Sequence, residues 1–161
     1  MDYEIIPAYD HPETVKELFS EYFDMIKAGD DNFDRYLVMQ NADEEISHLE
    51  GKYGLPDGRI YLLMAEGKAT GCIALRRIDS QSAELKRMYI RPAYRRNGFG
   101  EILVKKIIAD AGEIGYNTLL LDTLPFLDGA VRLYKRCGFV ETSPYNDSPM
   151  NGTIYMRLDL I

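Results

Sequence analysis

The alternation of apolar and polar positions predicts that this chain folds as an α/β protein. A short apolar run at residues 3–8 indicates a strand. An apolar stripe at helical spacing follows, made of Val15, Leu18, Phe19, Tyr22, Phe23 and Ile26. Residues 33–51 have a weaker helical pattern. Two strand-like runs at residues 60–65 and 71–78 come next, joined by a short polar link that is typical of a hairpin.

The second half of the chain alternates strands with helices. The predicted order is strand 85–90, helix 99–111, strand 118–123, helix 127–137, and strands 139–142 and 153–160. A strand, a helix and a further strand in this order form a crossover, so the strands at 85–90 and 118–123 should be parallel. The pattern therefore predicts a mixed sheet. A chain of 161 residues is long enough for one domain with its own core.

A basic loop connects the strand at 85–90 with the following helix. Residues 86–96 include no acidic residue and five basic ones, namely Lys86, Arg87, Arg91, Arg95 and Arg96. Gly98 and Gly100 then mark the start of the helix. The first N–H groups of a helix have no partner within the helix, and the helix dipole adds partial positive charge there. The loop is therefore a predicted site for an anion such as a phosphate.

Two common phosphate motifs do not fit this loop. A P-loop ends in Gly-Lys-Ser/Thr, whereas Gly100 is followed by Glu101 and Ile102. A dinucleotide fingerprint needs a third small residue where this chain has Leu103. What remains is Arg95-x-x-Gly98-x-Gly100, directly after a strand with Glu84 at its head.

This arrangement resembles the pyrophosphate-binding motif of the GNAT superfamily of acyl-CoA N-acyltransferases. A second block resembles the same family at the expected spacing: Leu121-Asp-Thr-Leu-Pro125 and Ala130-x-x-Leu133-Tyr134-x-x-x-Gly138-Phe139. The glycine motif alone is weakly specific, but the two blocks together cover residues 82–140.

The resemblance implies a fold and a cosubstrate. The fold would be α/β (α+β), with a mixed, mostly antiparallel sheet of about seven strands, a splayed parallel pair and about four helices, formed by residues 1–161 as a single N-acetyltransferase domain. The cosubstrate would be acetyl-CoA, with no metal. Its pyrophosphate and pantetheine would contact mainly the backbone. The implied binding residues are Met88, Tyr89, Ile90, Arg95, Arg96, Asn97, Gly98, Phe99 and Gly100.

The resemblance also assigns three catalytic positions for direct transfer of the acetyl group to a primary amine. Glu84 matches the general base of several members, and the alternative is that Glu84 pairs with a neighbouring cation while water is the base. Tyr134 matches the tyrosine near the sulfur and is the expected general acid, the alternative being an amphipathic core residue. The backbone N–H of Met88 is the expected oxyanion donor.

One position departs from the family pattern. Many members have an asparagine three residues before the alanine of the tyrosine-bearing helix, where it binds the pantetheine. This chain has Leu127 there. That contact is therefore missing or supplied by another group.

Composition narrows the class of protein further. With 46% hydrophobic and 28% charged residues, the chain has the composition of a folded protein. No apolar run approaches the ~20 residues of a membrane span, and the N-terminus lacks a basic-then-apolar leader, so we expect a cytoplasmic protein without a membrane partner. Cys72 and Cys137, with only two histidines, favour neither disulfides nor a zinc site.

Charge is unevenly distributed along the chain. Residues 1–50 contain 14 acidic and 3 basic residues, whereas residues 51–161 contain 12 acidic and 16 basic residues. No broad basic face is indicated, so nucleic acid is not an expected partner.

The acidic segment at residues 1–50 indicates which kind of acceptor to expect. In the family, the first two helices and the loop between the last two strands usually flank the acceptor. In this chain these segments supply Asp30, Asp31 and Asp34 and the aromatic residues Tyr22, Phe23, Phe33 and Tyr145. We therefore expect a small cationic amine or a peptide amino group, and not an anionic amino sugar. The alternative is that these acids are only solvated helix faces.

Two other classes of function stay open at this point. A non-catalytic acyl-CoA sensor would keep the loop at residues 95–100 but would not need Glu84 or Tyr134. A purely structural α/β module would need no phosphate site. The sequence leaves open the identity of the acceptor, the acyl-chain preference and whether the protein is a monomer or a homodimer.

Overall fold

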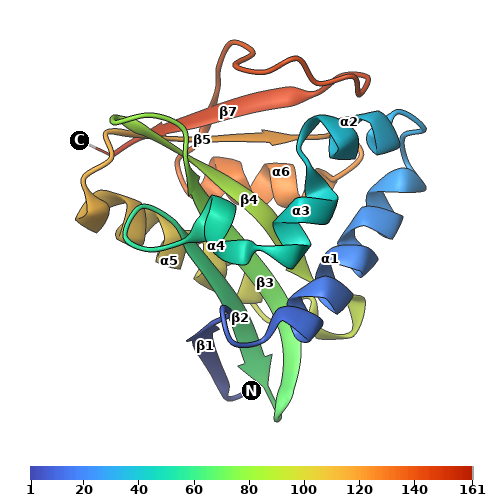
Figure 1. The fold of residues 1–161 in the computed structure, drawn as a ribbon, viewed down its shortest axis with the longest axis vertical. Helices are drawn as coiled ribbons and strands as arrows, with labels where there is room; N and C mark the ends of the chain where they lie inside the picture. The colour runs from blue at the N-terminus through green and yellow to red at the C-terminus, as the bar shows by residue number, and fades with distance from the viewer. Residues whose placement is uncertain (161) are drawn as a thin grey trace.

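The computed structural model describes residues 1–160 and contains a seven-stranded sheet in the order β1-β2-β3-β4-β5-β7-β6 (Figure 1). The strands are β1 (Tyr3–Pro7), β2 (Arg59–Ala65), β3 (Lys68–Arg77), β4 (Ser82–Ile90), β5 (Thr118–Thr123), β6 (Val140–Glu141) and β7 (Ile154–Asp159). Strands β4 and β5 are parallel, and the other neighbouring pairs are antiparallel. The predicted mixed sheet with one parallel pair is confirmed.

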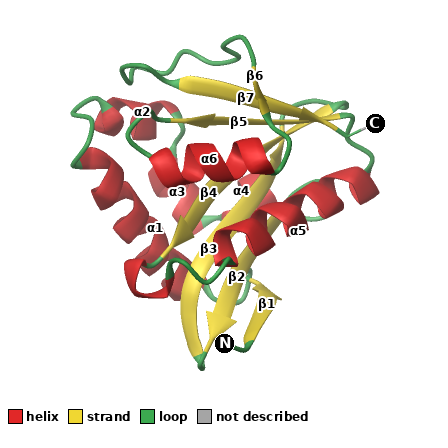
Figure 2. Cartoon of the chain, turned by 180° about the vertical axis from the view of Figure 1, so that it is seen from behind, coloured by secondary structure: helices red, strands yellow, loops and turns green. Residues whose placement is uncertain are grey.

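Helices cover both faces of this sheet. One face carries α1 (Pro12–Lys27), α2 (Phe33–Met39), α3 (Ala42–Ser47) and α4 (Leu49–Tyr53), which lie in front of the sheet in Figure 1. The other face carries α5 (Phe99–Ile114) and α6 (Asp128–Arg136), which lie in front in Figure 2. A short 3-10 turn, η1 (Pro92–Tyr94), precedes α5. No helix described within residues 1–160 has both the length and the apolar character that a membrane crossing requires.

Strand β2 illustrates why the sheet is covered on both faces. Its apolar side chains alternate, so that Ile60 and Leu62 pack with the core under α1–α4, while Tyr61 and Leu63 pack with the core under α5. A strand that is apolar on both faces must be buried on both. The two helical layers provide that cover.

The helical region after α1 differs in one detail from the expectation of about four helices in all. Residues 33–53 form three short helices rather than one long one, which brings the α-helices within residues 1–160 to six. Asn41 adopts a left-handed conformation, with φ of 53°, and His48 lies outside the helical region. These breaks let each short helix bury its own residues, such as Phe33 and Tyr36 in α2 and Tyr53 in α4.

The parallel pair separates along its length. The paired residues are Ser82–Thr118, Ala83–Leu119 and Glu84–Leu120. Both strands continue further, β4 to Ile90 and β5 to Thr123. The second half of β4 therefore runs beside a gap in the pairing.

A β-bulge in β4 changes which side chains face the α1–α4 layer. Cys72 pairs with Tyr89 and Ala74 pairs with Lys86, so three steps along β4 match two steps along β3. Arg87 has a φ of 58°, which is unusual for a residue with a side chain. Because a bulge interrupts the strict alternation of a strand, Lys86 and Arg87 both face the helices, Lys86 contacting Tyr36 and Arg87 contacting Glu45.

Candidate active site

A large groove lies where β4 and β5 separate, next to the first residues of α5 and α6. Its volume is about 600 Å³, within the usual range for ligand sites. β4 contributes Met88, Tyr89 and Ile90, and β5 contributes Asp122 and Thr123. The rest of the lining comes from α1, the loop before α5, the start of α5, and α6 with the residue before it, and includes Tyr22, Arg95, Arg96, Gly98, Phe99, Gly100, Leu127, Ala130 and Tyr134.

The start of α5 has the form that anion binding requires. Gly98 is the residue before the helix and has a φ of 76°, which favours glycine. A Cβ atom at Gly98 would meet nothing within 4 Å, so the space beside this backbone is open. Arg95 is held in place, because its Nε donates a 2.9 Å hydrogen bond to the Ile90 carbonyl.

The other basic residues of the predicted anion loop are engaged elsewhere. Arg91 pairs with Glu17 at 2.6 Å and with Glu21 at 2.8 Å, both on α1. Arg87 is buried and pairs with Glu45 on α3 at 2.8 Å. Of the five basic residues in the sequence cluster, Arg95 and Arg96 line the large groove. These two side chains are the basic residues that the resemblance implied for cosubstrate binding, and their contact with an anion stays a prediction.

The remaining residues implied for cosubstrate binding lie mostly along the groove. Phe99 and Ile90 line it while their side chains belong to the core under α5. A Cβ at Gly100 would lie 3.0 Å from Cδ2 of Leu133, so glycine lets α5 and α6 approach closely. Asn97 instead donates from Nδ2 to the Tyr94 carbonyl at 2.9 Å. Their contact with a cosubstrate stays a prediction.

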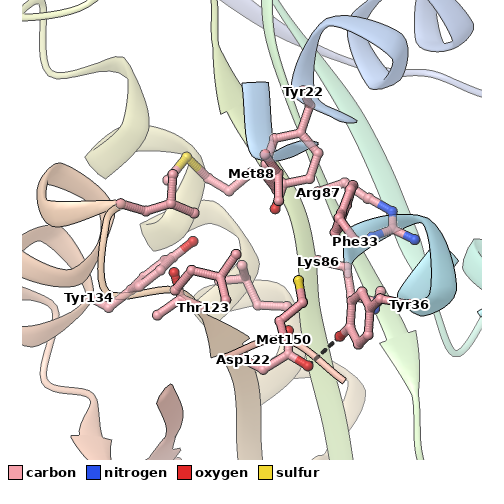
Figure 3. Close-up of a pocket in the computed structure, with 14 residues that line it drawn as sticks. Tyr22, Phe33, Tyr36, Lys86, Arg87, Met88, Asp122, Thr123, Tyr134 and Met150 are labelled. Carbon is pink, nitrogen blue, oxygen red and sulfur yellow. Dashed lines mark hydrogen bonds between the residues drawn. The ribbon is translucent and has the colours of Figure 1, made fainter. Parts of the chain in front are cut away.

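A smaller cavity adjoins the groove on the side of α1 and α2 (Figure 3). Its volume is about 30 Å³. Six residues line both spaces: Tyr22, Met88, Asp122, Thr123, Leu127 and Tyr134. The smaller cavity is completed by Ile26, Phe33, Tyr36, Leu85, Lys86, Arg87, Leu124 and Met150.

Tyr134 lies at the junction of the two spaces. Figure 3 shows its ring entering from α6, opposite the side chains of β4 and α2. The residue is buried, and burial raises the pKa of its phenol well above the usual value. The hydroxyl therefore stays protonated throughout the neutral range.

Glu84, the predicted base, is enclosed by partners. Arg76 donates from Nε at 2.7 Å, Tyr145 donates its hydroxyl at 2.5 Å, and Nζ of Lys86 lies 3.7 Å away. Burial alone would raise the pKa of Glu84, but Lys86, Tyr145 and Arg76 outweigh it and lower the pKa. Glu84 is not among the residues that line either space within residues 1–160. Its role as base stays a prediction that this geometry does not favour.

Asp122 is a carboxylate that does line both spaces. It lies in the last part of β5, beyond the three pairs that join β4 and β5. Its Oδ2 accepts hydrogen bonds from the Tyr36 hydroxyl and, at 2.8 Å, from Nδ2 of Asn146. The sequence contained a signal for this residue, because ligand-binding side chains often follow the carboxyl ends of diverging parallel strands.

The acidic residues expected beside the acceptor, called the acidic rim below (Asp30, Asp31 and Asp34), and the aromatic residues expected with them are distributed differently from the expectation. Tyr22 and Phe33 line the smaller cavity, whereas Tyr145 is bonded to Glu84. Asp30 accepts a 3.0 Å hydrogen bond from the Asn151 N–H, and Asp34 pairs with Lys27 at 3.0 Å. Among the described residues, the lining of the two spaces includes none of Asp30, Asp31, Asp34 and Phe23.

Comparisons with known proteins agree with this arrangement. Residues 13–139 match the model of the acetyltransferase (GNAT) family. The chain is 41% identical over 126 residues to an uncharacterized N-acetyltransferase of Schizosaccharomyces pombe, a match that covers 77% of each protein. Among solved structures, a GNAT-family acetyltransferase of Staphylococcus aureus has a TM-score of 0.78 at 23% identity, covering 99% of this chain and 100% of that one.

A second solved structure shares the fold over nearly the whole length. The PaiA N-acetyltransferase of Thermoplasma acidophilum, solved with coenzyme A, has a TM-score of 0.75 at 20% identity over 99% of both chains. The family match spans most of the chain, and it confirms both the family and the enzyme class predicted from the two sequence blocks. The chain thus belongs to the GNAT family and is an acyl-CoA-dependent acetyltransferase.

Proposed function

We propose that this enzyme transfers an acetyl group directly from acetyl-CoA to a primary amine, either a small amine or a peptide amino group. The observation that carries the proposal is that Asp122 and Tyr134 line both the groove and the smaller cavity. A carboxylate and a phenol thus lie where the two spaces meet. Direct transfer needs a group to accept a proton from the amine and a group to protonate the leaving thiolate.

The residues of the groove fit acetyl-CoA, which supplies the acetyl thioester when bound. The α5 start at Gly98, with Arg95 and Arg96, would hold the pyrophosphate through backbone N–H groups and charge. The part of β4 beyond Glu84, at residues 88–90, would hold the pantetheine through its backbone. Leu127 offers no side-chain hydrogen bond there, so this β4 backbone carries the polar contacts near the sulfur.

The side chains at the junction would then divide the proton transfers. Asp122 binds the ammonium form of the acceptor and takes one proton, with Glu84 as the alternative base. The free amine forms a C–N bond with the carbonyl carbon, the C–S bond breaks, and the nitrogen loses its second proton to solvent. Tyr134 gives a proton to the departing sulfur and is reprotonated from solvent, and the Met88 N–H donates to the thioester oxygen as negative charge develops there.

The whole chain contributes to this site. Tyr22 and Tyr36 come from the first two helices, whereas Tyr134 and Met150 come from the last third of the sequence. We therefore propose residues 1–161 as one N-acetyltransferase domain.

Two variants and a thermal-shift measurement test the proposal. At about a hundred times its Kd, acetyl-CoA should stabilise the fold by about 2.7 kcal/mol. That corresponds to a rise in melting temperature of roughly 5–10 °C. Gly98→Val should abolish the rise, because a branched side chain would fill the open space at the α5 start. Tyr134→Phe should keep the rise but lower kcat by about 10²- to 10⁴-fold, with activity followed by release of the free thiol of coenzyme A.

Gly67→Val is the matched control for Gly98→Val. Gly67 has a φ of 74°, and a Cβ there would also meet nothing within 4 Å, so the backbone strain of the two substitutions is alike. Gly67 lies in the turn between β2 and β3, away from the groove lining. A thermal rise that survives Gly98→Val would remove the α5 start from the cosubstrate site. Full activity of Tyr134→Phe would remove Tyr134 as the acid.

A further inference from the structure

We propose that the acceptor carries a carboxylate next to its amino group, as an α-amino acid does, and that Lys86 binds this carboxylate while Asp122 binds the amine. The inference deepens the proposed function and rests on it. It follows from two charged groups in the smaller cavity, Lys86 and Asp122, neither of which has a hydrogen-bonded partner of opposite charge within residues 1–160.

The first of these charges is the ammonium of Lys86. Its side chain is only 5% exposed and lines the smaller cavity. The nearest carboxylate oxygen, Oε1 of Glu84, is 3.7 Å from Nζ, which is too long for a hydrogen bond. That same oxygen already accepts a 2.7 Å bond from Arg76, so the charge of Glu84 is matched by a closer cation. A buried ammonium is costly to leave without a partner.

Burial also makes the charged form of Lys86 less stable, as its pKa indicates. Burial lowers the pKa of Lys86 to about 8, and the attraction of Glu84 offsets only part of that shift. An anionic group of a ligand at Nζ would stabilise the charged form and raise this pKa.

The second charged group without a hydrogen-bonded partner of opposite charge is the carboxylate of Asp122. Its two hydrogen-bond donors, the Tyr36 hydroxyl and Nδ2 of Asn146, are uncharged and both contact Oδ2. They orient the carboxylate without neutralising it. A ligand ammonium would make a charge-assisted hydrogen bond there, stronger than one between neutral groups.

Tyr36 places these two charges beside one another. Its hydroxyl donates to Asp122, and its ring centroid is 5.9 Å from Nζ of Lys86. In Figure 3, Lys86 and Asp122 approach the Tyr36 side chain from β4 and β5 respectively. The cavity lining therefore includes a positive and a negative group, both beside Tyr36.

The size of the cavity fits the carboxylate of an amino acid. A volume of about 30 Å³ has room for about two groups the size of a water molecule. The two oxygens of one carboxylate would fill this room, while the amino group at Asp122 and the rest of the acceptor would extend into the groove, which Asp122 also lines. An amine without a carboxylate would satisfy Asp122 but leave Lys86 buried without a hydrogen-bonded anion, and sites with buried polar groups reject ligands that leave those groups without hydrogen bonds.

The experiment compares matched acceptors. Alanine, alaninamide and ethylamine share an amino group and differ in the carboxylate, as do methionine, methioninamide and 3-(methylthio)propylamine. Acetylation is followed by thiol release and by mass spectrometry of the product. The amino acid of each set should have a kcat/KM about 10- to 100-fold above its two partners, the range expected for a hydrogen bond to a charged group.

Lys86→Met tests the assigned residue, with Lys105→Met as control. Methionine keeps much of the length of the lysine side chain but not its charge. Lys86→Met should remove the preference, lowering kcat/KM for the amino acids about 10- to 100-fold while the amides and amines keep their values. Lys105 lies on α5 with 67% of its side chain exposed, and Lys105→Met should change none of these values. The thermal rise with acetyl-CoA checks that each variant is folded.

Failure of this inference is distinguishable from failure of the proposed function. Equal kcat/KM for amines, amides and amino acids, or an equal loss with all three in Lys86→Met, would overturn the inference and leave amine acetylation standing. Absence of thiol release with every acceptor, from a protein that still binds acetyl-CoA, would overturn both.

Discussion

At the residue scale, Asp122 and Glu84 are two buried or half-buried carboxylates in different surroundings. Glu84 accepts hydrogen bonds from Arg76 and Tyr145 and lies near Lys86, so its charged form is stabilised and its pKa is lowered. Asp122 accepts hydrogen bonds only from uncharged donors among the described residues and lines both spaces of the site. A base must reach the proton that it removes, and geometry comes before basicity in choosing between candidates.

We therefore expect the two isosteric substitutions to differ. Asp122→Asn should lower kcat/KM by about 10²- to 10⁴-fold at neutral pH, and the loss should shrink at alkaline pH, where the free amine needs no base. Glu84→Gln should cost less activity, because Glu84 does not line either space. Steady-state kinetics across pH 6–10 and a melting curve for each variant check this. A larger loss in Glu84→Gln, with an unchanged melting curve, would return the role of base to Glu84.

At the scale of elements, the β4 bulge is held by an ion pair with α3. Arg87 donates from Nε and Nη2 to the carboxylate of Glu45 at 2.8 and 2.9 Å, and Lys52 of α4 donates to the same carboxylate at 2.8 Å. Burial alone would raise the pKa of Glu45, but Arg87 and Lys52 outweigh it and lower the pKa to about 2. The left-handed backbone at Arg87 is thus stabilised by a charge pair across two elements.

The pair should make a measurable, pH-dependent contribution to stability. A carboxyl whose pKa falls on folding stabilises the protein above its unfolded pKa and loses this effect as pH falls through the folded value. Glu45→Gln should therefore lower the free energy of unfolding by about 3 kcal/mol near neutral pH, from a shift between about 4.5 and about 2. The difference between wild type and variant should narrow below about pH 4.5 and approach zero near pH 2.

Urea unfolding at a series of pH values measures this difference. Glu44→Gln, on the same short helix with an exposed side chain, is the control and should change stability little. A Glu45→Gln variant as stable as wild type at pH 7 would contradict a structural role for the pair.

At the scale of the whole molecule, acidic residues of the N-terminal half bind basic residues of the C-terminal part. Glu17 and Glu21 on α1 pair with Arg91, and Glu45 on α3 pairs with Arg87. The uneven charge of the sequence therefore partly serves to join α1 and α3 to β4 and the residue that follows it. Asp30 has another structural contact, because it accepts a hydrogen bond from the Asn151 N–H, next to Met150 of the smaller cavity.

The acidic rim predicted from the sequence can be tested on this basis. Asp30, Asp31 and Asp34 lie outside the lining of both spaces, so their combined change to asparagine should alter kcat/KM by no more than about threefold, since exposed charges are screened over about 8–10 Å. Asparagine keeps an oxygen that can accept from Asn151. The test is kcat/KM measured between 20 mM and 500 mM salt, each value divided by the value at about 0.15 M salt. A large loss of activity together with loss of salt dependence would support the prediction that these three acidic residues attract the acceptor.

Features that depend on residues close in sequence followed from the sequence by itself. The strand and helix patterns, the crossover between β4 and β5, and the glycine turn before α5 are set by local spacing and backbone preference. The two motif blocks identified the family for the same reason, because each lies within one continuous segment. The weak pattern at residues 33–51 was divided into short helices only by packing on the sheet.

The tertiary structure alone decided which charges are balanced and which face the site. Arg87 and Arg91 belong to the same basic stretch as Arg95, but contacts with distant helices withdraw them from the groove. Glu84 has the position of a base, yet Arg76 and Tyr145 occupy its carboxylate. Lys86, Asp122 and Tyr36 share one cavity although they are far apart in the chain. Burial and ion pairing depend on long-range contacts, which no local pattern records.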